Sequence, residues 1–92
     1  MKREEMNKII LKEELDLYAK FYPNTIYYGE NCISYKVDEN NKYEILAMGE
    51  RGKVAFHYNG LEESEACTII LEYLRDSKFL AECAEERKKK IM

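Results

Sequence analysis

The sequence contains one histidine, His57, and only three cysteines, Cys32, Cys67 and Cys83, which lie far apart along the chain. No two cysteines form a CxxC pair, and a single histidine does not complete the ligand spacing of a zinc site. An odd number of cysteines also argues against a disulfide framework. We therefore expect no metal site and no cofactor, and we expect the thiols to be free and buried.

Glycine is scarce as well, and none of the four glycines falls in a phosphate-binding pattern. Gly49 and Gly52 are closest together, but they flank a turn between two expected strands. A phosphate loop needs its glycines between a strand and the start of a helix. The sequence therefore predicts no nucleotide-binding loop.

A nucleophile paired with a base is not evident. Alternation along the expected sheet places His57 on the same face as Cys32. A Cys–His pair would need hydrogen-bond contact and a third group that orients the histidine, and the sequence offers no such group. Neighbouring carboxylates such as Glu13 and Glu14 are usually solvated surface. We expect a protein that is not an enzyme, and a small enzyme that uses His57 is the weakest alternative.

Long apolar runs are absent. No segment approaches the ~18 consecutive apolar residues that a membrane span requires. Acids follow Lys2 and Arg3 directly, where a signal peptide would have its apolar region. We expect a soluble, cytoplasmic protein without a membrane partner.

Basic residues are scarce in the middle of the chain. Residues 21–77 contain ten acids and five bases, and the sequence pI is about 5.3. Domains that bind nucleic acids usually carry a basic surface and have a high pI. Direct binding of DNA or RNA is therefore disfavoured.

What the sequence does contain is enough apolar side chain for one small core. Its 92 residues are 46% hydrophobic and 36% charged, which fits a single domain spanning residues 1–92. A domain of this size buries only roughly 60–65% of its unfolded surface, so we expect a small stability margin.

Residues 3–22 are predicted to form a helix, which Pro23 ends. Glu14 projects from within the apolar side of this helix, either toward a buried base or, more simply, with its carboxylate reaching past the core to water. The apolar side is a broad arc at helical spacing that comprises Met6, Ile10, Leu11, Leu15, Leu17, Tyr18, Phe21 and Tyr22.

The middle of the chain predicts an antiparallel meander of short strands at about 26–28, 32–37, 42–48 and 53–58. Turn-forming clusters separate the strands, as in residues 38–41 and 49–52. Helices are predicted at about 62–75 and 77–90, the second capped by Asp76 or Ser77. The expected fold class is α+β, with one or two C-terminal helices packed on one face of the sheet.

The other face of the sheet is predicted to be unusually apolar for a solvated surface. Exposed apolar patches often mark interfaces, although helices on both faces or a homodimer would also account for this pattern. If Ile33, Tyr35, Ile45, Val54 and Phe56 face the helices, the outer face carries Tyr27, Cys32, Leu46, Met48, Ala55 and His57.

One stretch combines a Glu-Arg-Gly turn, a returning strand and an acidic helix start, in residues 49–53 (GERGK), 54–56 (VAF) and 61–67 (LEESEAC). It resembles small bacterial immunity proteins of polymorphic toxin systems, among them the immunity protein 59 family. The resemblance spans about residues 27–75. It implies a cytoplasmic antidote that binds a cognate toxin domain and blocks the toxin's active site or its substrate.

This interpretation makes the site a partner-binding surface. Many toxins of such systems are nucleases with basic clefts, which an acidic surface would complement. The alternative function is a homodimeric regulatory or adaptor protein unrelated to toxins. The expected ring of acids consists of Glu30, Asp38, Glu39, Glu44, Glu50, Glu62, Glu63 and Glu65, and the expected central contacts are Tyr27, Leu46, Met48 and His57.

Overall fold

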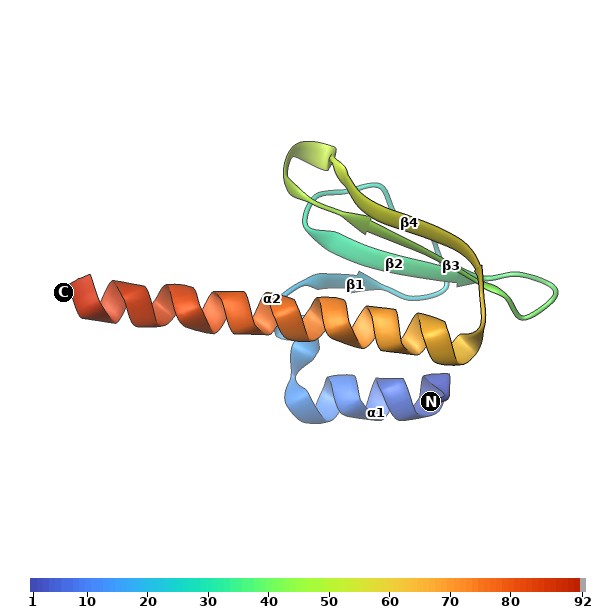
Figure 1. Ribbon diagram of the computed structural model, residues 1–92, viewed down its shortest axis with the longest axis horizontal. Helices are drawn as coiled ribbons and strands as arrows, with labels where there is room; N and C mark the ends of the chain where they lie inside the picture. The colour runs from blue at the N-terminus through green and yellow to red at the C-terminus, as the bar shows by residue number, and fades with distance from the viewer. Residues whose placement is uncertain (92) are drawn as a thin grey trace.

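The computed structural model describes the backbone of residues 1–91 and the side chains of residues 1–85 (Figure 1). The four strands form one sheet in the order β1-β2-β3-β4; β1 is parallel to β2, and the other pairs are antiparallel. In chain order the elements are α1 (Arg3–Glu13), η1 (Leu15–Leu17), β1 (Lys20–Tyr22), β2 (Cys32–Val37), β3 (Tyr43–Met48), η2 (Glu50–Gly52), β4 (Val54–Leu61) and α2 (Glu63–Ile91).

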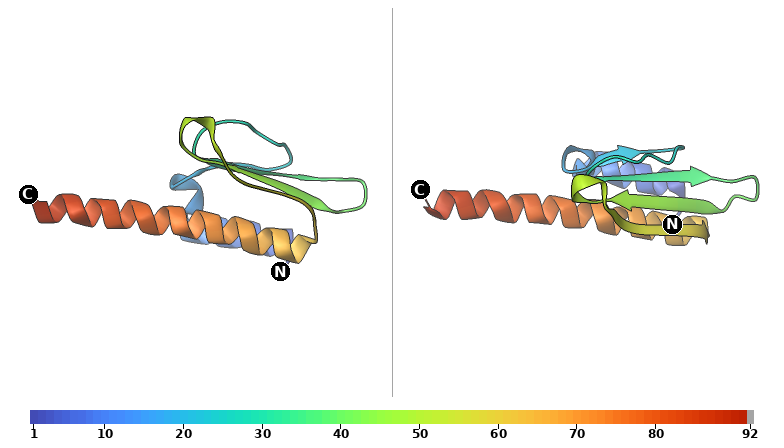
Figure 2. Two further views of the ribbon diagram at one scale, coloured as in Figure 1. Left: turned by 45° about the horizontal axis from the view of Figure 1, so that its top comes forward. Right: turned by 90° about the horizontal axis from the view of Figure 1, so that it is seen from above.

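Both α-helices lie on the same face of the sheet (Figures 1 and 2). The predicted α+β class and the helix layer on one face are therefore confirmed. Among the described residues, no helix has the length and apolar content needed to cross a membrane. The main core lies between sheet and helices and consists of Met6, Ile10, Leu15, Ile33, Tyr35, Tyr43, Ile45, Ala47, Ala66, Cys67, Ile70, Leu71 and Leu74.

The first helix is shorter than predicted, because it ends at Glu13 and not at residue 22. Glu14 takes a left-handed conformation with φ 54° and ψ 39°, and its N–H points back to the carbonyls of Ile10 and Leu11. Such a left-handed residue is a common helix C-cap. Leu15 then packs fully buried beneath the helix end. Glu14 is exposed because it lies outside the helix, so its carboxylate never enters the apolar arc.

Glycine at this cap is expected to stabilise the protein. Left-handed geometry costs an L-residue roughly 1–2 kcal/mol, whereas the entropy cost of glycine on folding is roughly 0.5–1 kcal/mol. We expect Glu14→Gly to raise the free energy of unfolding by about 0.5–1 kcal/mol, measured by urea denaturation. The same substitution inside α1, Glu5→Gly, should lower it by about as much. Equal losses in both variants would contradict this account of the helix end.

Strand β1 was not predicted. Its three residues alternate, so that Phe21 packs on the main core and Tyr22 on the opposite face of the sheet. The helical arc predicted for residues 3–22 is consequently wrong beyond Glu13. Leu17, which was expected in that arc, is 70% exposed. Within α1 itself the arc is narrower than predicted, since Leu11 is 73% exposed.

Residues 23–31 do not contain the predicted strand at 26–28. This segment is a loop with one isolated bridge, between Thr25 and Tyr35. The loop crosses the outer face of the sheet and brings Ile26 down beside Tyr22. Its asparagines at both ends, Asn24 and Asn31, take left-handed conformations that suit tight turns.

The two predicted C-terminal helices are a single helix, α2. The break expected at residues 76–77 does not form: α2 continues through them, and the Ser77 hydroxyl donates to the carbonyl of Tyr73 one turn earlier, at 3.0 Å, instead of capping a helix start. Arg75 donates two hydrogen bonds to Glu13, at 3.0 and 2.7 Å, and lowers the pKa of that carboxyl. Lys78 adds a hydrogen bond to the Glu13 carbonyl, so α2 holds the end of α1.

Candidate partner-binding surface

The apolar patch predicted for the outer sheet face is covered. Leu46 is 1% exposed and Met48 is 4% exposed, and Cys32 beneath them is fully buried. Tyr22 and Ile26 pack over these three side chains and form a second, smaller core. The prediction that Leu46 and Met48 are central contacts for a partner is therefore wrong, because the loop of residues 23–31 takes the place that a partner was expected to fill.

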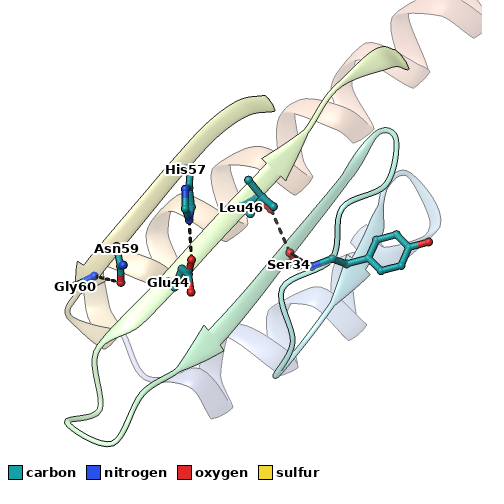
Figure 3. Close-up of polar contacts among 7 residues, drawn as sticks. Ser34, Glu44, Leu46, His57, Asn59 and Gly60 are labelled. Atoms are coloured by element: carbon teal, nitrogen blue, oxygen red, sulfur yellow. Dashed lines mark hydrogen bonds and ion pairs between the residues drawn. The ribbon is translucent and has the colours of Figure 1, made fainter. Parts of the chain in front are cut away.

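Ser34 attaches this loop to the sheet. Its side chain is fully buried, accepts a hydrogen bond from the backbone N–H of Tyr27 at 3.0 Å, and donates to the carbonyl of Leu46 at 3.4 Å (Figure 3). The hydroxyl thus satisfies a loop donor and a strand acceptor at once. The alternation of side chains along the predicted strand indicates that Ser34 lies on the outer face. It does not reveal that a loop packs over Ser34.

Removing this hydroxyl should loosen the loop. Ser34→Ala leaves the N–H of Tyr27 without its partner, and an unsatisfied buried group costs about 1–3 kcal/mol. We expect the free energy of unfolding to fall by about 1–2 kcal/mol and hydrogen exchange to quicken in residues 23–31. The exposed Thr68→Ala, which also loses a hydroxyl bonded to the backbone, should change stability by less than about 0.5 kcal/mol. A Ser34 variant with unchanged loop exchange would contradict this role.

Two tyrosines of the loop remain available at the surface. The ring of Tyr27 stacks on Tyr22 with centroids 4.2 Å apart and is still 44% exposed. Tyr28 is 72% exposed and was missed as a candidate contact, because its stretch was assigned to a strand. The turn residues that flank it, Asn24 before and Gly29 after, were the available indication of a loop.

His57 and Glu44 form a hydrogen-bonded pair on the outer face (Figure 3). The imidazole Nε2 lies 2.7 Å from a Glu44 carboxylate oxygen, and both side chains reach solvent. Cys32 is on β2, separated from His57 on β4 by the whole of β3, which is about 10 Å at the usual strand spacing. The Cys–His pair considered from the sequence is therefore not assembled, and Glu44 and His57 are available as polar contacts.

Five of the predicted acids gather at one end of the sheet, where the β2–β3 turn meets the start of α2 (Figure 1). Lys42 lies among them, paired with Glu62. The hydrogen bond to Glu62 is the main cause of the raised pKa of Lys42, and the charges of Asp38 and Glu65 add to it. We call this region the hairpin end; its acids are Asp38, Glu39, Glu62, Glu63 and Glu65.

The other predicted acids do not complete a ring. Glu30 and Glu50 lie at the opposite end of the sheet, where the N–H of Asn31 donates to the carbonyl of Gly49 at 3.1 Å. Glu44 lies between the two ends on the outer face. The structure thus divides the predicted ring into a five-residue cluster, a distant pair and one isolated carboxylate.

Two acids of the hairpin end stabilise the fold through hydrogen bonds. The carboxylate of Asp38 accepts hydrogen bonds from the backbone N–H groups of Asn40 and Lys42, at 2.8 and 2.9 Å, and closes the turn. Glu63 accepts from the hydroxyl of Tyr43 at 3.3 Å and from the backbone of Arg3 at 3.4 Å, joining β3, α1 and α2. Glu39, Glu62 and Glu65 are the exposed acids that can face a partner.

The surface around the hairpin end is hollowed on three sides. The hollows have volumes of about 470, 410 and 420 Å³; the first two share Lys36 in their walls, and the last two share Val37. The first, on the outer face, is lined by Asn24, Thr25, Ile26, Tyr28, Lys36 and Glu44. The second follows the turn at Lys36, Val37, Asp38, Glu39 and Asn40, and the third is lined by Arg3, Val37, Asn41, Tyr43, Glu62 and Glu63.

Tyr43 and Cys67, next to the third hollow, have their acid–base behaviour changed by burial. Burial raises the pKa of Tyr43 and of Cys67, so both stay protonated near neutral pH. Among the described residues, no group of three or more histidine, cysteine or acidic side chains is arranged to hold a metal ion. Comparisons with protein-family models, with curated proteins and with solved structures found no match.

Proposed function

We propose that this chain is a non-catalytic immunity protein, which binds a cognate bacterial toxin domain and blocks its active site. The observation that carries the proposal is the hairpin end, where exposed carboxylates surround a hollowed surface. Glu39, Glu62 and Glu65 are exposed there, and Glu62 is paired with Lys42. A flat or apolar surface would fit many partners, whereas a clustered negative charge selects a basic one.

The electrostatics suit a toxin that acts on nucleic acid. The active site of such an enzyme is a basic cleft, and an acidic protein that enters the cleft competes directly with the substrate. Opposite charges raise association rates by 10–10³-fold through steering. Tyr28, at the outer flank of the hairpin end, supplies the large exposed aromatic side chain typical of interface hot spots.

The sequence resemblance to immunity proteins supports the same function. It spans residues 27–75, which cover β2, β3, β4 and the first half of α2. These elements supply all five acids of the hairpin end, and α1 adds Arg3 to the wall of the third hollow. A homodimeric adaptor that pairs through its outer sheet face is the weaker proposal, since Leu46 and Met48 are buried there.

Co-expression with the neighbouring gene tests this function. Under our proposal the gene immediately upstream encodes a large secreted protein whose C-terminal domain is toxic. We expect that domain to arrest growth when expressed alone and to be tolerated, as a 1:1 complex, when this chain is co-expressed. Growth arrest that persists despite a folded, expressed chain would refute the proposal for that pair.

A further inference from the structure

A groove runs between the free edge of the sheet and α2. Its floor is aromatic: Phe56 and Tyr73 meet edge-on with centroids 6.1 Å apart, and Phe56 and Tyr58 lie 5.3 Å apart. Tyr58 is 45% exposed. The groove has a volume of about 310 Å³ and is lined by Phe56, Tyr58, Ile69, Glu72, Tyr73, Asp76, Ser77 and Leu80.

The same helix extends far beyond the sheet (Figures 1 and 2). Its 29 residues span about 43 Å, whereas the longest strand, of 8 residues, spans about 26 Å. Leu74 is the last fully buried side chain of α2 described. Past it, Phe79 and Leu80 are 64% and 67% exposed, although both are large and apolar.

The exposed Leu80 and the residues of α2 that line the groove lie on one face of the helix. Ile69, Tyr73, Asp76, Leu80 and Cys83 follow each other at spacings of four, three, four and three residues. Alternating spacings of three and four residues place side chains along the contact line of two packed helices. We call these five residues the seam. The seam lines the groove from Ile69 to Leu80, and Cys83 lies past the groove on the projecting part of the helix.

We propose that two copies of this chain pair through this seam, with their α2 helices antiparallel about a two-fold axis near Asp76. The projecting half of each helix then covers the groove of the other copy, so that Leu80 packs beside the partner's Tyr73. A two-fold interface requires a self-complementary surface. Here one face of α2 carries both the groove and the exposed Leu80 at its edge, so two copies can present the same seam to each other.

Other occupants fit the groove less well. An added strand would need a regular edge on β4, but the pairing of β3 with β4 shifts register at two places, between Tyr43 and Ile45 and between Ala47 and Met48. Bulges of this kind disfavour pairing with another strand. An apolar helix face is the better complement, and the chain carries one itself. With the axis near Asp76, the far end of one α2 lies beside the start of the partner's α2, so the interface reaches the hairpin end.

The pairing is expected to be weak. The seam engages fewer residues than the roughly 20–30 per partner of a standard interface, and two Asp76 carboxylates approach each other at the axis. We expect a dissociation constant on the order of 10–100 µM, in the range of weak pairings. Removing the repulsion with Asp76→Asn is expected to tighten the dimer about threefold or more.

Sedimentation equilibrium of the chain alone, over roughly 5–500 µM, tests the proposal. The mass is expected to rise from 11.0 kDa toward twice that value, 2 × 11.0 = 22.0 kDa. Leu80→Glu should weaken pairing at least about tenfold, while Leu11→Glu, at an equally exposed leucine on α1, should leave it unchanged. A wild-type chain that stays at 11.0 kDa, or a dimer that survives Leu80→Glu, would overturn the proposal.

A cross-link tests the antiparallel geometry separately. In a Cys83→Ser background, Asp76→Cys places a thiol near the axis, where it meets its own copy. Mild oxidation should give a covalent dimer on a non-reducing gel, and Asp16→Cys, on η1, should not. A cross-link from residue 16 and none from residue 76 would overturn this arrangement. These measurements use the chain alone, so their outcome is independent of the toxin-binding proposal.

Discussion

Tyr35→Ala is expected to lower the free energy of unfolding by about 3–5 kcal/mol, the usual cost of deleting a large buried aromatic side chain. Tyr35 is 1% exposed and packs between Phe21 and Tyr43, with ring centroids 5.8 and 5.6 Å away. Deleting the ring leaves a cavity where β1, β2 and β3 meet. A chain of 92 residues has a total stability of about 5–14 kcal/mol, so the loss is a large share of it.

Urea denaturation followed by circular dichroism measures this effect. Tyr28→Ala is the matched control, since it removes the same side chain from an exposed loop position and should change stability by less than about 0.5 kcal/mol. If both tyrosine variants lost the same small amount, the core would not be packed around Tyr35 as the structure describes.

Neutralising the exposed acids of the hairpin end should slow association with the toxin domain by roughly tenfold or more. The variant Glu39→Gln/Glu62→Gln/Glu65→Gln removes three charges from the proposed docking surface and spares Asp38 and Glu63, whose carboxylates hold the fold together. Stopped-flow binding gives the rate. Salt should have the same effect in the wild type, since the Debye length falls from ~14 to ~4 Å between about 50 and 500 mM.

The control is a second triple variant with the same net charge, Asp16→Asn/Glu30→Gln/Glu50→Gln, whose positions lie toward the opposite end of the sheet. It tests which end of the sheet attracts the toxin. A general effect of net charge would slow both variants equally. Slowing in the second variant alone would place docking at Glu30 and Glu50, contrary to our proposal.

The strands whose side chains alternate regularly were predicted closely from the sequence. Residues 32–37 form β2 as predicted, and β3 and β4 begin within one residue of their expected positions. Ile33, Tyr35 and Ile45 face the helices. Val54 does not: a register shift next to it turns it away from the core, and it is exposed. A bulge depends on strand pairing, which periodicity does not describe.

Elements that depend on distant contacts were not predictable. Lys20–Tyr22 is too short to show a pattern, and it becomes a strand only because β2 accepts it. The loop of residues 23–31 covers Leu46 and Met48 through the buried hydroxyl of Ser34, which looks like any polar strand residue in the sequence. The site prediction failed at these two residues for that reason, whereas the acids of the hairpin end lie on a turn and a helix start, and their role as partner contacts stays a prediction.

Hydrogen–deuterium exchange of the chain, with and without the toxin domain encoded upstream, tests the central claim most directly. We predict that binding protects residues 36–43 and 61–66, which form the hairpin end, and leaves residues 14–20 at the far end unchanged. Protection restricted to the far end, or no protection at saturating toxin domain, would contradict the claim that this protein acts by presenting its acidic hairpin end to a partner.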